Sequence, residues 1–422
     1  MLKSQNLKRY FQFALVVLAA GSIFPLIYLR TGYQETILEV FGMSISQLNT
    51  IYTILGIVFT VGYFPSGILA DKFSAKRLLT VSVFMTGLAG LWFAQIPSHS
   101  NVLIIFTIWG IFSVFTFWAA HLKLVKLLCK KEEEGRFFGI LDGGRGVVEA
   151  VLASVAILIF SNILGGRDDL ETTRTALASV IYMYSIVLIV VAVLVGIFVS
   201  PDRSKAGSEP KEKPQKSTVG FADILKVFKN IPIMMLGFII FAGYSLWWTY
   251  FYFGGFLQTN IGASAVTVGV VMLVCQWMRP VGGIISGFLA DKFGKARIVA
   301  LSTIVTSILL IVIATLPAGL GNGVFYALIV GTSLSLFFLR GTFWSLLGDC
   351  EVEEGVLGIA IGCVSFFGYL PDIILPIGIN ILIYDFNFGD TGFYTPYFIA
   401  SSILGIASVF LIRKFYTMTK KG

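Results

Sequence analysis

Ser66-Gly-Ile-Leu-Ala-Asp-Lys-Phe73 recurs as Ser286-Gly-Phe-Leu-Ala-Asp-Lys-Phe293, and this repeated stretch decides the fold. Seven of the eight residues are identical, and the two copies lie 220 residues apart. Glu133-Glu134-Gly135 recurs as Glu353-Glu354-Gly355 at the same offset. Two separate matches at one offset indicate that the halves of the chain are structural copies of each other.

The composition places this repeat in a membrane. Of the 422 residues, 56% are hydrophobic and 13% are charged, and the mean hydropathy is +0.87. Soluble proteins carry about 25% charged residues. The low charge excludes a water-soluble enzyme, a nucleic-acid-binding protein and a disordered chain. The four cysteines form no CxxC pair, so we expect no disulfide framework, no structural metal and no cofactor.

Apolar stretches long enough to cross a bilayer, about 20 residues each, occur twelve times in two groups of six. They lie near 10–29, 46–70, 77–96, 101–128, 137–163, 175–199, 231–257, 264–290, 297–317, 321–347, 356–384 and 393–412. Parallel repeats of this kind predict an all-α membrane protein with twelve transmembrane helices in two pseudo-symmetric six-helix bundles, 1–199 and 231–422. The polar segment 200–230 between them predicts a cytoplasmic linker that includes a short helix on the membrane surface.

The basic residues predict the orientation of the chain. Three of the 31 Lys and Arg residues, Arg30, Arg167 and Arg174, fall in loops on one side, whereas most of the others fall in the termini and loops of the opposite side. The positive-inside rule then places both termini in the cytoplasm. The short loops favour a bacterial inner (plasma) membrane. We expect a multi-pass monomer in lipid with no nucleic-acid partner.

At the repeated stretch the chain resembles transporters of the major facilitator superfamily (MFS). That family carries Gly-x-x-x-Asp-(Arg/Lys)-x-Gly-(Arg/Lys)-(Arg/Lys) between spans 2 and 3. The two copies match this pattern, or continue it, at Gly67, Asp71, Lys72, Arg77, Asp291, Lys292 and Arg297. The resemblance implies a conformational latch in which the aspartate meets a helix end of the opposite half. Ser74 and Ala75 depart from the pattern in the first copy, and these charges could alternatively be topological anchors alone.

Ionisable side chains inside membrane spans are costly and point to function. Eight lie in the spans or at their edges: Lys123, Lys126, Asp142, Arg145, Glu149, Arg279, Arg340 and Asp372. Five cations against three carboxylates leave a surplus of two positive charges, and an anionic substrate would supply the missing counter-charge. An arginine suits the paired oxygens of a carboxylate, sulfonate or phosphate. The alternative is that water in a central cavity solvates the surplus.

The resemblance implies that spans 1, 4, 7 and 10 line the central cavity, with spans 2, 5, 8 and 11 beside them. The substrate-binding residues that we expect there are Arg145, Arg279, Arg340, Lys123, Tyr28, Tyr244, Trp248 and Gln276. Tyr244, Trp248 and Tyr252 follow at i, i+4 and i+8, which predicts either a stacking wall of the cavity or an ordinary packing face. Lys126 is more typical of an interfacial anchor.

Three carboxylates are candidates for proton coupling. Asp142, Arg145 and Glu149 share one face of span 5, so Arg145 can pair with either carboxylate. This trio is either a structural ion pair or a place where a proton exchanges for a salt bridge. Asp372 of span 11 is the third candidate, and its neighbours Pro371 and Pro376 predict a kink.

These observations predict a secondary transporter that moves a small organic anion, of the carboxylate, sulfonate or phosphorylated-sugar class, by alternating access and in symport with protons. No GxxxxGK[ST] motif is present, so the energy is expected to come from an ion gradient. The alternatives are a proton-driven exporter of drugs or metabolites and a transporter-like ligand sensor. We do not expect an enzyme, because no nucleophile or metal-ligand pattern occurs in the sequence.

Overall fold

The computed structural model describes the chain except for residues 1, 130–133, 201–226, 353–356 and 421–422, and it leaves out some further side chains, that of Asp71 among them. By its contacts the chain divides into two compact units. Unit 1 is Met1–Asp202 with Phe251–Pro280, and unit 2 is Arg203–Tyr250 with Val281–Gly422. The linker and surface helix predicted over 200–230 lie outside the described residues except at their ends.

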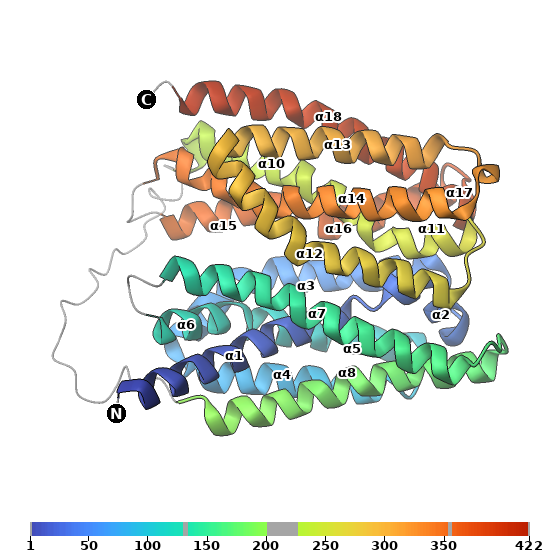
Figure 1. Ribbon diagram of the computed structural model, residues 1–422, viewed down its shortest axis with the longest axis horizontal. Coiled ribbons are helices and arrows are strands. Elements are labelled where there is room, and N and C mark those ends of the chain that lie inside the picture. Colours follow the sequence, from blue (N-terminus) through green and yellow to red (C-terminus); the bar gives the residue numbers. More distant parts are fainter. Residues whose placement is uncertain (1, 130–133, 201–226, 353–356, 421–422) are drawn as a thin grey trace. The chain divides into compact units, whose positions relative to one another are not determined.

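Unit 1 is a bundle of long helices. Its helices are α1 (Leu2–Ile27), α2 (Arg30–Phe41), α3 (Ile45–Lys72), α4 (Ala75–Phe93), α5 (His99–Gly110), α6 (Trp118–Leu128), α7 (Glu134–Leu164), α8 (Leu170–Phe198), α11 (Phe253–Thr259) and the first part of α12 (Ala265–Phe293). Helix α1 packs against α7 and α8, and α4 packs against α8 (Figure 1). Glycine permits the α1–α7 approach, because a Cβ at Gly21 would lie 2.6 Å from Val148 Cβ.

Unit 2 repeats the same kind of packing. Its helices are α10 (Ile231–Trp248), the end of α12, α13 (Lys295–Thr315), α14 (Asn322–Thr342), α15 (Leu357–Gly368), α16 (Pro371–Tyr384), α17 (Gly389–Gly392) and α18 (Tyr394–Thr419). Helix α13 packs against α14 and α18, and α10 packs against α15 and α18 (Figure 1). Pro371 begins α16 directly after the break from α15, so the predicted interruption of span 11 is present.

The helix boundaries follow the sequence repeat. Helix α3 begins at Ile45 and α12 at Ala265, 220 residues later, and α4 and α13 begin at Ala75 and Lys295 with the same offset. The capping chemistry is repeated too. Ser44 Oγ accepts the Gln47 N–H at 3.2 Å, and Ser264 Oγ accepts the Thr267 N–H at 3.2 Å. The duplicated sequence therefore starts equivalent helices in the same way.

The described helices confirm the predicted fold class of an all-α membrane protein. Eleven of them are long and apolar enough to cross a membrane, and the remaining predicted span, near 77–96, corresponds to the 19-residue helix α4. Large apolar side chains such as Phe288 and Phe410, each 74% exposed, suit a lipid environment. Helix α1 ends at Ile27, near the predicted end of the first span, but a second helix, α2, follows directly at Arg30.

Candidate functional site

In the described part of the chain, four spans besides the interrupted span 11 depart from regular α-helix at internal positions. Tyr33, in the continuation of the first span, has φ −134°, and Ile111–Phe115 form a π-helical turn between α5 and α6. Thr249–Tyr252 form a 3₁₀ turn after α10, and Phe343–Cys350 form another after α14. These are spans 1, 4, 7 and 10, which the family resemblance assigned to the cavity. Such interruptions occur often at functional sites in transporters.

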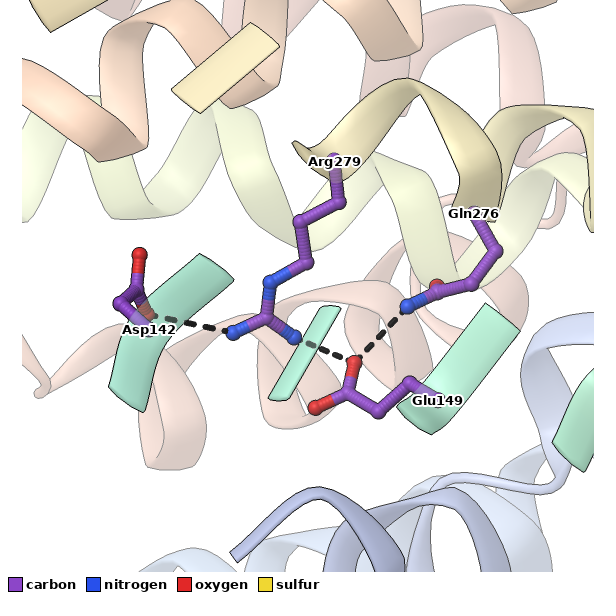
Figure 2. A network of polar contacts seen from close by, with 4 residues as sticks. All are labelled: Asp142, Glu149, Gln276 and Arg279. Atoms are coloured by element: carbon purple, nitrogen blue, oxygen red, sulfur yellow. Dashed lines mark hydrogen bonds and ion pairs between the residues drawn. The ribbon is translucent and has the colours of Figure 1, made fainter. Parts of the chain in front are cut away.

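An ion-pair network in unit 1 joins α7 to α12 (Figure 2). Arg279 Nη1 donates to Glu149 Oε2, and Gln276 Nε2 donates to the same oxygen at 2.8 Å. Arg279 Nη2 also lies 3.5 Å from Asp142 Oδ1. The Arg279 and Glu149 side chains are 14% and 11% exposed, whereas that of Asp142 is 69% exposed. Glu149 is therefore the principal counter-charge of Arg279.

A glycine on α7 makes room for this network. A Cβ at Gly146 would lie 3.2 Å from Arg279 Cδ and 3.5 Å from Pro280 Cδ. The contact with Arg279 is tighter than ordinary van der Waals packing, so the missing side chain lets Arg279 lie directly against α7.

The sequence identified both carboxylates of this network but not the cation that joins them. We predicted pairing within span 5, between Arg145 and either carboxylate, whereas Arg279 of α12 contacts both Asp142 and Glu149. The Arg145 guanidinium lies 5.6 Å from the centre of the Phe24 ring. Helical spacing shows which residues share a face, but it does not show which neighbouring helix that face meets.

Arg30 is a buried cation, and its predicted position in a loop was wrong. It was expected in a loop, but it begins α2 and is 0% exposed. Its Nη1 donates to Asn49 Oδ1 at 3.2 Å and its Nη2 to Gln34 Oε1 at 2.5 Å. The guanidinium also lies 4.2 Å from the centre of the Tyr252 ring, whose hydroxyl donates to Asn49 Oδ1 at 2.7 Å. Both hydrogen-bonding partners of Arg30 are thus neutral amides.

A signal for this cluster was present in the sequence. Arg30 and Gln34 are four residues apart, and Asn49 interrupts an apolar span, where an amide needs a partner. The predicted site residue Tyr28 lies beside the cluster. Its ring stacks on Tyr52 at 5.7 Å and on Phe251 at 4.7 Å between centres.

Span 4 holds three further polar residues of unit 1, Lys123, Lys126 and His121. Lys123 donates from Nζ to the carbonyl oxygen of Ala70, near the end of α3, whereas Lys126 is exposed. His121 is 0% exposed and stacks on Phe117 at 4.8 Å, and its Nε2 has no hydrogen-bond partner among the described residues. Lys123, predicted to bind substrate, thus contacts a helix end.

Unit 2 contains a buried carboxylate with neutral partners. Asp372, in the first turn of α16, is 3% exposed. Its Oδ1 accepts the Tyr244 hydroxyl at 2.9 Å and Trp248 Nε1 at 2.8 Å, both from α10. The structure thereby brings together two of the predicted substrate-binding residues and one of the predicted proton-coupling residues.

The predicted aromatic stripe does not continue along one helix face. Tyr244 and Trp248 contact Asp372, whereas Tyr252 contacts Asn49 in unit 1. The reason is local, because α10 ends at Trp248 and the 3₁₀ turn that follows changes the helical phase. Residues at i, i+4 and i+8 share one helix face only as long as the α-helix continues.

Arg340 also lies in unit 2, on the last turn of α14. Its guanidinium carbon is 4.4 Å from the centre of the Trp247 ring, a cation–π contact, and the side chain is half-buried. Among the residues that the structure describes, no carboxylate lies within 4.0 Å of Arg340. In this it differs from Arg279, whose charge the chain itself compensates.

The predicted latch residues lie at equivalent helix boundaries in the two units. The side chain of Asp71 lies outside the described residues, whereas Lys72, Arg77, Asp291, Lys292 and Arg297 are exposed. The two loops differ in backbone. Gly294 has φ +96°, where glycine is favoured, but the equivalent Ser74 has φ −63°. The departure from the family pattern at Ser74 therefore accompanies a different turn.

Interrupted spans and ionisable groups inside them define the class of an α-helical membrane transporter, and comparisons with known proteins identify the family. The family model described as Major Facilitator Superfamily matches residues 10–376. The chain therefore belongs to the Major Facilitator Superfamily.

The chain is also similar to a known bacterial protein and to solved structures. Inner membrane protein YqcE of Escherichia coli (strain K12) is 28% identical over 379 residues, which cover 88% of this chain and 87% of that protein. A bacterial homologue of the human lysosomal transporter Spinster has a TM-score of 0.70 at 16% identity, covering 98% of this chain and 97% of that chain. The nucleoside transporter NupG has a TM-score of 0.70 at 13% identity, covering 97% and 99%. The structural likenesses show the fold.

Proposed function

We propose that this transporter moves a small organic anion, of the carboxylate, sulfonate or phosphorylated-sugar class, by alternating access and in symport with protons. The observation that carries the proposal is Arg340. Its guanidinium rests on the Trp247 ring, and no carboxylate of the described residues lies within 4.0 Å. A cation held in a membrane span with no carboxylate in direct contact favours an anionic ligand.

The contacts of the other cations support a division of roles. Arg279 is compensated by Glu149 and Asp142, so we assign it with Gln276 to holding α12 on α7. Arg30 has amide partners only and retains a net buried positive charge in unit 1. We therefore assign part of the positive surplus inferred from the sequence to Arg30, which was not counted there, and none of it to Arg279.

The setting of the protein is part of the proposal. YqcE is named an inner membrane protein, which supports the same location for this chain. The excess of Lys and Arg in the termini and in the loops of one side supports cytoplasmic termini. We propose a monomer, since each unit already contains the charged residues discussed above.

Counterflow in proteoliposomes tests the anion. Vesicles with the purified full-length chain are preloaded with a carboxylate, a sulfonate or a sugar phosphate, and uptake of the same labelled compound is followed. We expect at least one class to be exchanged, and Arg340→Gln to abolish that exchange. Arg413→Gln is the matched control, because Arg413 is exposed on α18 of the same unit.

The outcomes separate the proposal from its alternatives. Uptake of every anion that is unchanged in Arg340→Gln contradicts the anion site. Exchange of neutral or cationic drugs, sensitive to substitution of Tyr244 and Trp248, would instead support an exporter. Ligand-induced thermal stabilisation with no exchange of any compound would support a sensor.

A further inference from the structure

We propose that Asp372 is the residue that binds the coupling proton, and that this proton determines whether Arg340 is available to the anion. The first statement concerns a proton-binding carboxyl group and stands by itself. The second rests on the anion transport proposed above. Both come from the surroundings of Asp372 in unit 2.

The hydrogen bonds of Asp372 leave one oxygen for a proton. Tyr244 and Trp248 both donate to Oδ1, and no hydrogen bond or ion pair of the described residues involves Oδ2. A proton on Oδ2 therefore breaks neither bond. The carboxyl group can gain or lose a proton without rearranging the helices that hold it.

Opposing effects act on the charge of this carboxylate. Removal from water at 3% exposure disfavours an ionised group. The two donors and the first turn of α16, where the helix dipole favours a negative charge, oppose that effect. No cation of the described residues lies within 4.0 Å of the Asp372 carboxylate. Both protonation states are thus compatible with the same fold.

Glu149 has a different environment, although the sequence predicted the same role for it. Its Oε2 accepts from both Arg279 and Gln276, and its ion pair with Arg279 is largely buried. A proton on Glu149 would remove the buried counter-charge of Arg279, and the Asp142 carboxylate at 3.5 Å is exposed. We therefore assign Glu149 to positioning and Asp372 to proton binding.

Few charged or titratable groups surround Asp372. The helices packed against α16 are α10, α17 and α18. Tyr244 of α10 is the titratable group in contact, Asp390 of α17 is exposed, and Tyr394 and Tyr397 of α18 make no hydrogen bond to Asp372. Arg340 of α14 rests on the ring of Trp247, and the next residue, Trp248, donates to Asp372. Arg340 is therefore the cation coupled to this carboxylate.

This arrangement links the proton to the anion. When Asp372 is ionised, its negative charge offsets the field of Arg340 and competes with an anionic ligand. When a proton from one side of the membrane occupies Oδ2, Arg340 attracts the anion without that competition. Release of the anion and the proton on the other side restores the carboxylate. Because binding linkage is reciprocal, the anion must also favour the protonated form.

Spectroscopy on the purified full-length protein tests the proton site without any substrate. Infrared difference spectra between low and high pH are recorded across roughly pH 4 to 9, the range in which carboxyl groups in proteins titrate. We expect a protonated-carboxyl band that disappears in Asp372→Asn and persists in Asp372→Glu. Tryptophan fluorescence should change with the same midpoint, and Trp248→Phe should remove that change.

Two controls make this result specific. Asp385→Asn removes an exposed carboxylate at the other end of α16, and Glu149→Gln removes the ion-paired one. Both variants should keep the band and its midpoint. The assignment is overturned if the band survives in folded Asp372→Asn or disappears in Glu149→Gln. Should Asp372→Asn fail to fold, Asp372→Glu must shift the midpoint, and an unchanged midpoint also overturns it.

Transport then tests the link to Arg340. For an anion identified by counterflow, apparent affinity of the wild type should weaken as the pH rises, and in Asp372→Asn it should become independent of pH. Asp372→Asn should also lose uptake driven by a pH gradient while keeping exchange. Affinity that still follows pH in Asp372→Asn overturns the link. If no anion is exchanged, the proposed function is wrong, but the infrared spectra still test proton binding by Asp372 independently.

Discussion

Glu149→Gln tests whether the ion pair between Glu149 and Arg279 stabilises the fold more than an ordinary polar contact between helices would. Glutamine keeps the volume of the side chain and an oxygen that can accept from Gln276 and Arg279, so the change removes little except the charge. Arg279, 14% exposed, then loses its buried counter-charge, and Asp142 at 3.5 Å is largely exposed. We expect a marked loss of stability.

The geometry sets the size of this loss. Removing one partner of a buried ion pair costs about 3–5 kcal/mol. The remaining pair with Asp142, whose side chain is 69% exposed, can return up to about 1 kcal/mol. Glu149→Gln should therefore lower the free energy of unfolding by about 2–4 kcal/mol. Asp142→Asn is the matched control and should cost less than about 1 kcal/mol.

The assay is denaturant unfolding of the purified protein in micelles, with a double-mutant cycle over Glu149→Gln and Arg279→Gln. The coupling free energy should be about 2–3 kcal/mol, because the double variant leaves no buried charge unpaired. Polar contacts between membrane helices average about 0.6 kcal/mol. A measured coupling free energy at or below that value refutes the proposal that the Glu149–Arg279 ion pair holds α12 on α7.

Three further predictions concern unit 1, each measured by unfolding. Asn49→Ala should lower the free energy of unfolding by about 2–4 kcal/mol, because Arg30 Nη1 and the Tyr252 hydroxyl lose their acceptor, whereas Asn49→Asp should raise it by supplying a carboxylate. Gly254→Ala should cost about 1–3 kcal/mol, since its Cβ would lie 2.6 Å from the Thr31 carbonyl oxygen, and Gly283→Ala, with nothing within 4 Å, is the control. The pKa of Asp169, which caps α8, is lowered by the Thr172 N–H and hydroxyl. The contribution of Asp169 to the free energy of unfolding is thus complete above the unfolded-state pKa and is lost as the pH falls through the folded-state pKa. The free energy of unfolding of Asp169→Ala should therefore be lower than that of the wild type near neutral pH and should approach it in acid.

The architecture was largely predictable because its signals are local or periodic. An apolar run of about 20 residues can only cross the bilayer or aggregate, so hydropathy locates the spans. The 220-residue repeat then predicts equivalent helices, and α3 and α12 begin where it requires. The helix that begins at Arg30 was missed, because Arg30 next to an apolar run was interpreted as a loop residue instead of a buried one.

The candidate site was predictable only as a set of residues. Asp142, Glu149, Arg279 and Asp372 were all identified, since charges are rare and costly in membrane spans. Their pairing was not, because residues 130 positions apart met on facing helices, as Arg279 and Glu149 do. The aromatic stripe failed for a related reason, because a 3₁₀ turn at Thr249–Tyr252 broke the helical phase on which the prediction relied.

By itself, then, the sequence determined that this chain is a duplicated bundle of membrane helices, where its spans lie, and which few ionisable side chains enter them. The tertiary structure alone decided which charges are compensated. It joined Arg279 to Glu149, gave Arg30 two amides as hydrogen-bond acceptors, and placed Asp372 between two neutral donors. The physical reason is that helix formation depends on neighbours along the chain, whereas the energy of a buried charge depends on the groups across the helix interface.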